Sequence, residues 1–233
     1  MPTCFFTLLF TGCMPLKLNK MVSYYTPIPE TVKELDIPKY DVKNQLNGYP
    51  FVYWHFTKQK ERQLNLERAE FSNYSLLFRL WITHPVGRKG QPHGMLEIKQ
   101  DFSEWTCNLY FMNVDFDASH LSETITTHIK IELRPKKNDW NFIVDSLYQL
   151  NFDILPTDEA IPNYYRNNSG YGNNSPTYSF EYATKNLYRF YQYNNVEQKS
   201  DKFWQAECVQ KILELLDDEF NWHNLGYDYF REN

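Results

Sequence analysis

The chain lacks the features that mark membrane-spanning, nucleic-acid-binding and zinc-binding proteins. Its longest apolar run, residues 4–10, is far shorter than the ~20 residues that a membrane-spanning helix needs. There is no long basic run and the net charge is −5, whereas binding to nucleic acid requires a basic face. The four cysteines have neither CxxC nor zinc-ligand spacing. We therefore expect no spanning helix, no nucleic-acid partner and no bound metal or other cofactor.

Motifs of the common enzyme classes are also absent. The sequence contains no Gly-x-Ser-x-Gly, no His-Glu-x-x-His and no phosphate-binding loop. His84 and His93 flank a Pro/Gly-rich loop without a third ligand in view, and the acids at 217–219 end a predicted helix, where acids are usually solvated. We assign no catalytic residue and expect a protein that acts by binding, with a hydrolase as one alternative.

Aromatic side chains, in contrast, are abundant. The 233 residues include 18 Tyr, 17 Phe and 6 Trp, a length that fits one domain or one domain with a tail. Tyr and Trp combine a large apolar area with a polar group, which suits a hydrated binding surface. Aromatic residues are also favoured in β-strands. Composition alone therefore fits both a binding protein and an aromatic-rich sheet.

The N-terminal stretch has the pattern of an export signal. Residues 4–12, "CFFTLLFTG", have the length of the apolar region of a signal peptide. The following Thr11-Gly12-Cys13 resembles the lipobox of bacterial lipoproteins, in which the cysteine is acylated and becomes the first residue after cleavage. This resemblance implies a signal peptide over 1–12, lipidation of Cys13, and a lipid anchor on the periplasmic or cell-surface side of a bacterial membrane.

Residues 13–48 then read as a tether and lead-in, because prolines punctuate a polar stretch. An alternative reading starts translation at Met21, which would leave the protein in the cytoplasm. Residues 49–233 are expected to form a single domain, since no second linker is evident.

The middle of the chain alternates between apolar and polar residues. This period-two pattern predicts antiparallel strands over 74–83, 95–100, 104–116 and 123–135, arranged as a meander. In the last of these the alternation places Ile125, Ile129, Ile131 and Leu133 on one face. The stretch "PFVYWHF" (50–56) also reads as a strand, and the charged residues 57–72 as a surface helix or a polar hairpin.

The C-terminal third changes period. Apolar spacing predicts helices over 139–151 and 201–220, and a hairpin over 177–193 that turns near Lys185-Asn186. Strands and helices segregated in this way predict an α+β fold: an antiparallel sheet, made of the meander and the hairpin, with two helices packed on one face. The residues expected between these helices and the sheet are Trp140, Leu147, Cys208, Ile212 and Leu216.

The hairpin supplies the candidate binding face. Directly opposed residues share a face of a hairpin, so one face collects aromatic side chains and one cation. Because an unpaired buried guanidinium is costly, we expect this face to be at least half accessible; the alternative is that it packs under a helix. Its members are Tyr178, Phe180, Tyr182, Arg189, Tyr191 and Tyr193.

The same region resembles an uncharacterised family of small lipoproteins from gut-type Gram-negative bacteria. The likeness begins at Trp140 and includes a "Tyr-x-x-Glu-x-Ala" strand and a "Tyr-Arg-x-x-x-Tyr-x-Asn" strand. The matching residues are Tyr178, Glu181, Ala183, Tyr188, Arg189, Tyr193 and Asn194. This resemblance implies a location at a membrane and no particular activity.

Taken together, these patterns predict a monomeric, membrane-tethered lipoprotein that binds a ligand or a protein partner. Two other classes fit the acidity and the aromatic content: a toxin-immunity or inhibitor protein, and a glycan-binding accessory protein. Cys107 and Cys208 both point inward on their predicted elements, and they either form a disulfide or remain two buried free thiols.

Overall fold

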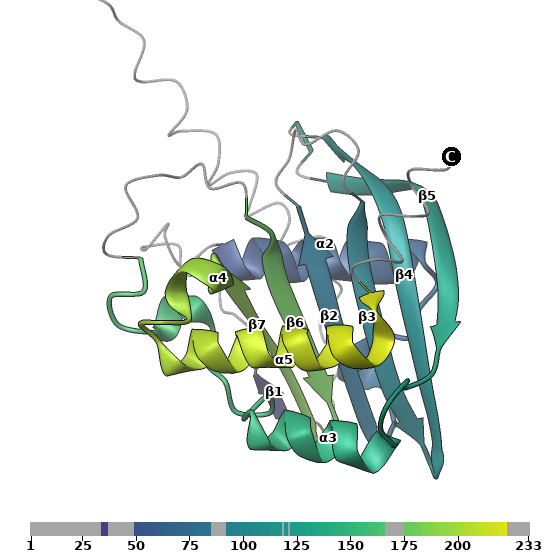
Figure 1. Cartoon of the computed structure of the whole chain (residues 1–233). Coiled ribbons are helices and arrows are strands. Elements are labelled where there is room, and N and C mark those ends of the chain that lie inside the picture. Colours follow the sequence, from purple (N-terminus) through teal and green to yellow (C-terminus); the bar gives the residue numbers. More distant parts are fainter. Residues whose placement is uncertain are drawn as a thin grey trace, which may run out of the picture.

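The computed structural model describes residues 34–36, 49–84, 92–117, 119–120, 122–165 and 175–222, which build one seven-stranded sheet with helices on both faces (Figure 1). The strands are β1 (Glu34–Asp36), β2 (Leu76–Thr83), β3 (His93–Asp101), β4 (Glu104–Asp117), β5 (Ser122–Leu133), β6 (Thr177–Ala183) and β7 (Leu187–Asn194). The α-helices are α2 (Tyr49–Gln63), α3 (Trp140–Gln149), α4 (Val196–Lys199) and α5 (Trp204–Phe220), with 3₁₀ turns η2 (Ala69–Phe71) and η3 (Asp158–Ala160).

The sheet has the order β1-β7-β6-β2-β3-β4-β5. β2 to β5 form the predicted antiparallel meander, and the β6–β7 hairpin joins it because β6 pairs with β2. β1 pairs in parallel with β7 at the opposite edge, although it lies within the segment expected as a lead-in. The α+β class, the meander and the hairpin are thus confirmed.

The prediction of a strand over 50–56 is wrong, because these residues lie in α2. Aromatic residues favour strands, but tertiary packing overrides such a preference. Trp54 and Lys58, four residues apart, and Glu61, three residues further, all face the sheet and are buried. One face of the helix therefore includes both aromatic and charged residues, and this face packs on the sheet.

The expectation of two helices on one face accounts for only part of the helical structure. α3 and α5 lie on one face of the sheet, whereas α2 covers the other (Figure 1). Leu147 of α3 and Ile212 and Leu216 of α5 are buried in the main core, as predicted. Trp140 and Cys208 are only partly buried against it.

One extra residue in β5 changes which side chains share a face. The β4–β5 register shifts so that Asn113 is opposite Thr127 and Val114 is opposite Ile125, which leaves Thr126 as a β-bulge. Ile125 consequently packs on the α2 side, while residues 129, 131 and 133 pack against the main core. The prediction that all four share a face is wrong, because an inserted residue inverts the alternation.

The turn between β3 and β4 holds an aromatic residue in an unfavourable conformation. Among the residues that the structure describes, six non-glycine residues have positive φ. Five are asparagines, which tolerate the left-handed region, and the sixth is Phe102, with φ 53°. Phe102 lies between the paired Asp101 and Glu104, and its side chain is 88% exposed. With so little of its side chain covered, packing against the described residues does little to offset this backbone strain.

Replacing Phe102 with asparagine should therefore stabilise the fold. The left-handed conformation costs most L-residues ~1–2 kcal/mol, so we expect Phe102→Asn to raise the free energy of unfolding by about 1 kcal/mol. Urea denaturation measures this change. Phe142→Asn is the control, because Phe142 is also exposed but lies in α3, where asparagine is a poor helix former. An unchanged or lower stability of Phe102→Asn would contradict the strain argument.

Candidate functional site

The hairpin has the predicted register and not the predicted accessibility. Tyr178 is opposite Tyr193, Phe180 opposite Tyr191, and Tyr182 opposite Arg189. All five aromatic side chains are buried, and the Phe180 and Tyr191 rings stack with their centroids 4.9 Å apart. The expectation of a half-accessible face is wrong, and this face belongs to the main core.

The polar groups of this face explain how it can be buried. The Tyr191 hydroxyl donates to the Phe152 carbonyl at 2.6 Å, and the Tyr193 hydroxyl donates to the Pro156 carbonyl at 2.6 Å. The Arg189 guanidinium donates to the Leu155 carbonyl at 3.2 Å and to the Asp153 carbonyl. The segment after α3 thus supplies the acceptors that remove the cost of burial.

The opposite face of the hairpin carries an ionic cluster that sequence reasoning missed. Six charged side chains, each at most 3% exposed, lie together between α2 and the sheet. We call them the buried charge network; they are Lys58, Glu61, Glu70, Arg79, Glu97 and Glu181. The two buried cations face four carboxylates, and two more exposed cations add to the balance: Arg68 pairs with Glu70, and Lys99 lies 3.9 Å from Glu97.

Lys58 is the centre of one half of this network. Its Nζ lies 2.5 Å from a Glu181 oxygen, 2.8 Å from Glu70 and 2.9 Å from Glu61. Oxygens of these three carboxylates lie within 4.8 Å of one another, a donor set that could hold a cation. The Lys58 ammonium already takes that place, so the arrangement is a compensated ion cluster and not an open metal site.

Arg79 organises the other half. Its guanidinium contacts Glu61 at 2.5 Å and Glu97 at 2.7 Å, and one nitrogen is 4.0 Å from Glu181. The Glu181 carboxylate also accepts from Trp81 Nε1 at 2.8 Å and from the Tyr188 hydroxyl at 2.7 Å. Glu181 therefore joins both cations and the sheet.

The network separates the protonation states of its carboxylates. Burial would raise the pKa of Glu181, but the charges of Lys58 and Arg79 lower it. Burial and the negative charge of Glu181 raise the pKa of Glu61 to about 8. The charges of Lys58 and Arg79 oppose the rise of the pKa of Glu61 without cancelling it, so the network favours a proton on Glu61 over one on Glu181.

This difference predicts how stability depends on pH. The ordinary pKa of Glu61 is 4.5, so between that value and about 8 the folded state holds a proton that the unfolded state has lost. Stability from this group therefore falls as pH rises through the window. We expect Glu61→Gln to weaken the fall between pH 5 and pH 8, measured by urea unfolding at both values. Equal pH slopes for the two proteins would contradict the assignment.

Glu181→Gln is the matched comparison. It removes the ionised carboxylate that contacts both Lys58 and Arg79. Removing one partner of a buried ion pair costs about 3–5 kcal/mol. At pH 7 we therefore expect Glu181→Gln to be far less stable than Glu61→Gln.

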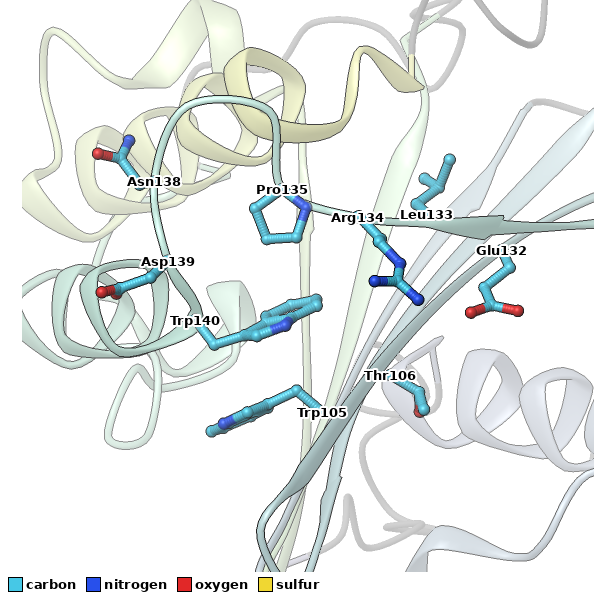
Figure 2. Close-up of a pocket in the computed structure, with 9 residues that line it drawn as sticks. All are labelled: Trp105, Thr106, Glu132, Leu133, Arg134, Pro135, Asn138, Asp139 and Trp140. Carbon is cyan, nitrogen blue, oxygen red and sulfur yellow. The ribbon is translucent and has the colours of Figure 1, made fainter.

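A surface pocket lies at the other end of the sheet. It is a cavity of about 320 Å³ beside the start of α3, the start of β4 and the end of β5 (Figure 2). We call it the tryptophan pocket; it is lined by Trp105, Thr106, Glu132, Leu133, Arg134, Pro135, Asn138, Asp139 and Trp140.

Two half-buried indoles form its apolar part. Trp105 and Trp140 stack with ring centroids 5.7 Å apart and an interplanar angle of 15° (Figure 2). The ring centroids of Trp140 and Phe220 lie 6.0 Å apart, so the indole pair also packs against α5. The two rings come from distant parts of the chain and hold each other in a fixed orientation.

Charged and polar residues line the rest of the pocket. Glu132 and Arg134 are exposed at the end of β5. Asp139 caps α3 by accepting the Phe142 N–H at 2.9 Å, and Asn138 donates to Glu219. Glu132 alternates with Leu133 and therefore points to the opposite face of the sheet from the indoles. The pocket thus combines an apolar platform with Arg134 and Asp139 as the charged residues of its lining. Among the pocket residues, the sequence singled out Trp140 as a core residue and Leu133 as part of an apolar strand face, and it gave no signal for a site at Trp105 or Arg134.

Other sequence candidates do not gather into a site. Burial, followed by the charges of Lys60 and His84, lowers the pKa of His93 to about 2. The Lys60 ammonium also disfavours a bound cation there. Cys107 and Cys208 are free thiols, so the disulfide alternative is wrong. Cys13 lies outside the described residues. No helix in the described ranges is long and apolar enough to cross a membrane.

Comparison of the chain with family models, with curated proteins and with solved structures gave no match.

Proposed function

We propose that the protein acts by binding, and that the tryptophan pocket takes a sugar ring of a glycan. The observation that carries this proposal is the fixed pair of half-buried indoles beside exposed charged groups. The six aromatic and basic residues of the hairpin offer no such surface, because they are used in the core.

The chemistry of the lining fits this class of ligand. A sugar has C–H groups on the faces of its ring, which pack on an indole, and hydroxyls around its rim. Asp139 offers an acceptor for hydroxyl protons, and Arg134 offers donors. Since the two indoles already hold each other in place, little conformational freedom is lost when a ligand binds.

The location of this activity is a separate part of the proposal. The "LLFTGC" stretch supports lipidation at Cys13, which would anchor the domain to a bacterial membrane with residues from 13 onward as the tether. A binding protein held at a cell envelope would meet glycans there.

A second candidate function, inhibition of a protein, is supported by the β3–β4 turn. Phe102 is 88% exposed between two acids and adopts a strained backbone conformation. Strained exposed residues cluster at functional sites, and an aromatic anchor flanked by acids suits insertion into a basic partner.

Calorimetric titration tests the glycan proposal. With a panel of gluco-, manno- and galacto-oligosaccharides, we expect wild-type protein to bind at least one sugar. Trp140→Ala and Arg134→Ala should each weaken that binding by at least ~10-fold, or about 1.4 kcal/mol, because they remove the platform and the donors. Trp204→Ala is the matched control, since Trp204 is 54% exposed on α5 and does not line the pocket.

Thermal unfolding of each variant separates a lost contact from a lost fold. Arg134→Ala removes an exposed side chain and should leave the unfolding temperature near that of wild type. Failure of every sugar to bind, or an equal loss in Trp204→Ala, would overturn the proposal.

A further inference from the structure

The outer edge of β5 is covered over only part of its length. Gln59 of α2 accepts the Glu123 N–H at 2.9 Å. Gln63 accepts the Ile125 N–H at 2.7 Å and donates to the Glu123 carbonyl at 2.8 Å. These two side chains thus bond to the backbone as a neighbouring strand would. Up to the bulge at Thr126, side chains of α2 thus satisfy hydrogen-bonding groups of the outer β5 backbone, in place of a neighbouring strand.

Beyond the bulge the same edge is open. β5 is the last strand of the sheet, with β4 as its neighbour on one side (Figure 1). Within the described ranges, no hydrogen bond reaches the outer backbone edge of residues 127–133. An unpaired edge is a template for another strand, and proteins usually protect it. α2 protects one half of this edge and leaves the other half unprotected.

The open half has a self-complementary pattern. Ile129, Ile131 and Leu133 face the main-core side, while Lys130 and Glu132 face the other side and are exposed. Around Ile131, the cation and the acid are placed symmetrically, one residue to each side. A strand with this pattern can meet a reversed copy of itself with opposite charges in register.

We propose that β5 pairs antiparallel with β5 of a second copy of this chain, about a two-fold axis at Ile131. In this register Lys130 is opposite Glu132 of the partner subunit, and the reciprocal pair forms on the other side of the axis. Ile129 is likewise opposite Leu133 of the partner subunit, which extends the apolar face across the interface. The two sheets then form one continuous sheet, as in strand addition.

Neighbouring registers are disfavoured by charge. Directly opposed residues share a face, so the symmetric alternatives are centred one residue away, on Lys130 or Glu132. The first opposes two ammonium groups and the second opposes two carboxylates. Like charges directly opposite are destabilising, so the sequence selects the Ile131 register by penalising the alternatives.

This dimer would also bring the partner subunit to the tryptophan pocket. The Ile131 register places Arg134, which lines the pocket, opposite the partner subunit's His128. The pocket would then lie next to the interface. The dimer does not depend on the proposed glycan binding, since it rests on the strand edge alone.

Sedimentation velocity of the full chain tests the pairing over a range of concentrations. Wild type should show a reversible monomer–dimer equilibrium. Lys130→Glu and Glu132→Lys should each raise the dissociation constant at least tenfold, since each opposes like charges twice. The double variant Lys130→Glu/Glu132→Lys should return the dissociation constant to within about threefold of wild type, because it reverses both signs.

Lys211→Glu is the control, since it makes the same charge change at an exposed site on α5 and should leave the dimer intact. Thermal unfolding confirms that each variant is folded. Wild-type protein that stays monomeric at about 100 µM, the highest concentration of the series, would overturn the proposal. A dimer that survives both single variants, or that the double variant fails to restore, would also overturn it.

Discussion

The ion pair between Lys58 and Glu181 is the interaction on which the arrangement of the two layers depends. It joins α2 to β6 at 2.5 Å in a place that water does not reach. A buried ion pair is weak evidence for net stability, because desolvating both charges offsets their attraction. Its effect is on specificity: α2 placed anywhere else on the sheet would leave a buried charge without a partner. We infer that the network fixes where α2 lies more than it stabilises the fold.

The sheet thus has two faces with different physical characters. The α3/α5 face is packed by apolar and aromatic side chains, and its polar tips end on backbone carbonyls of the segment that follows α3. The α2 face holds the buried charge network and a small apolar cluster around Trp81 and Met95. β6 contributes to both faces, because its side chains alternate between the aromatic core on one side and the α2 side, where Glu181 lies, on the other. A change in β6 should therefore affect both layers.

Sequence patterns predicted the strands well and the faces less well. The meander and the hairpin follow from alternation and from turn residues, which are local signals. α2 was not predicted as a helix over its whole length, because its aromatic start resembles a strand and its charged end resembles a solvated surface. Lys58 and Glu61 are spaced as one helix face, but their partners Glu70, Arg79 and Glu181 lie elsewhere in the sequence. Only the fold shows that these charges compensate one another.

The same distinction applies to the candidate sites. Trp105 and Trp140 are separated by the whole of β5, so their stacking has no local signature. Arg189 appeared too costly to bury, because carbonyl acceptors of the 153–155 segment cannot be counted from sequence. The β5 bulge is similar: a single unpaired Thr126 inverts the alternation and places Ile129, Ile131 and Leu133 on the side of the main core. Without that inversion the open edge would present these residues toward the α2 side. The bulge therefore determines on which face of the sheet the apolar side chains of the open half of β5 lie.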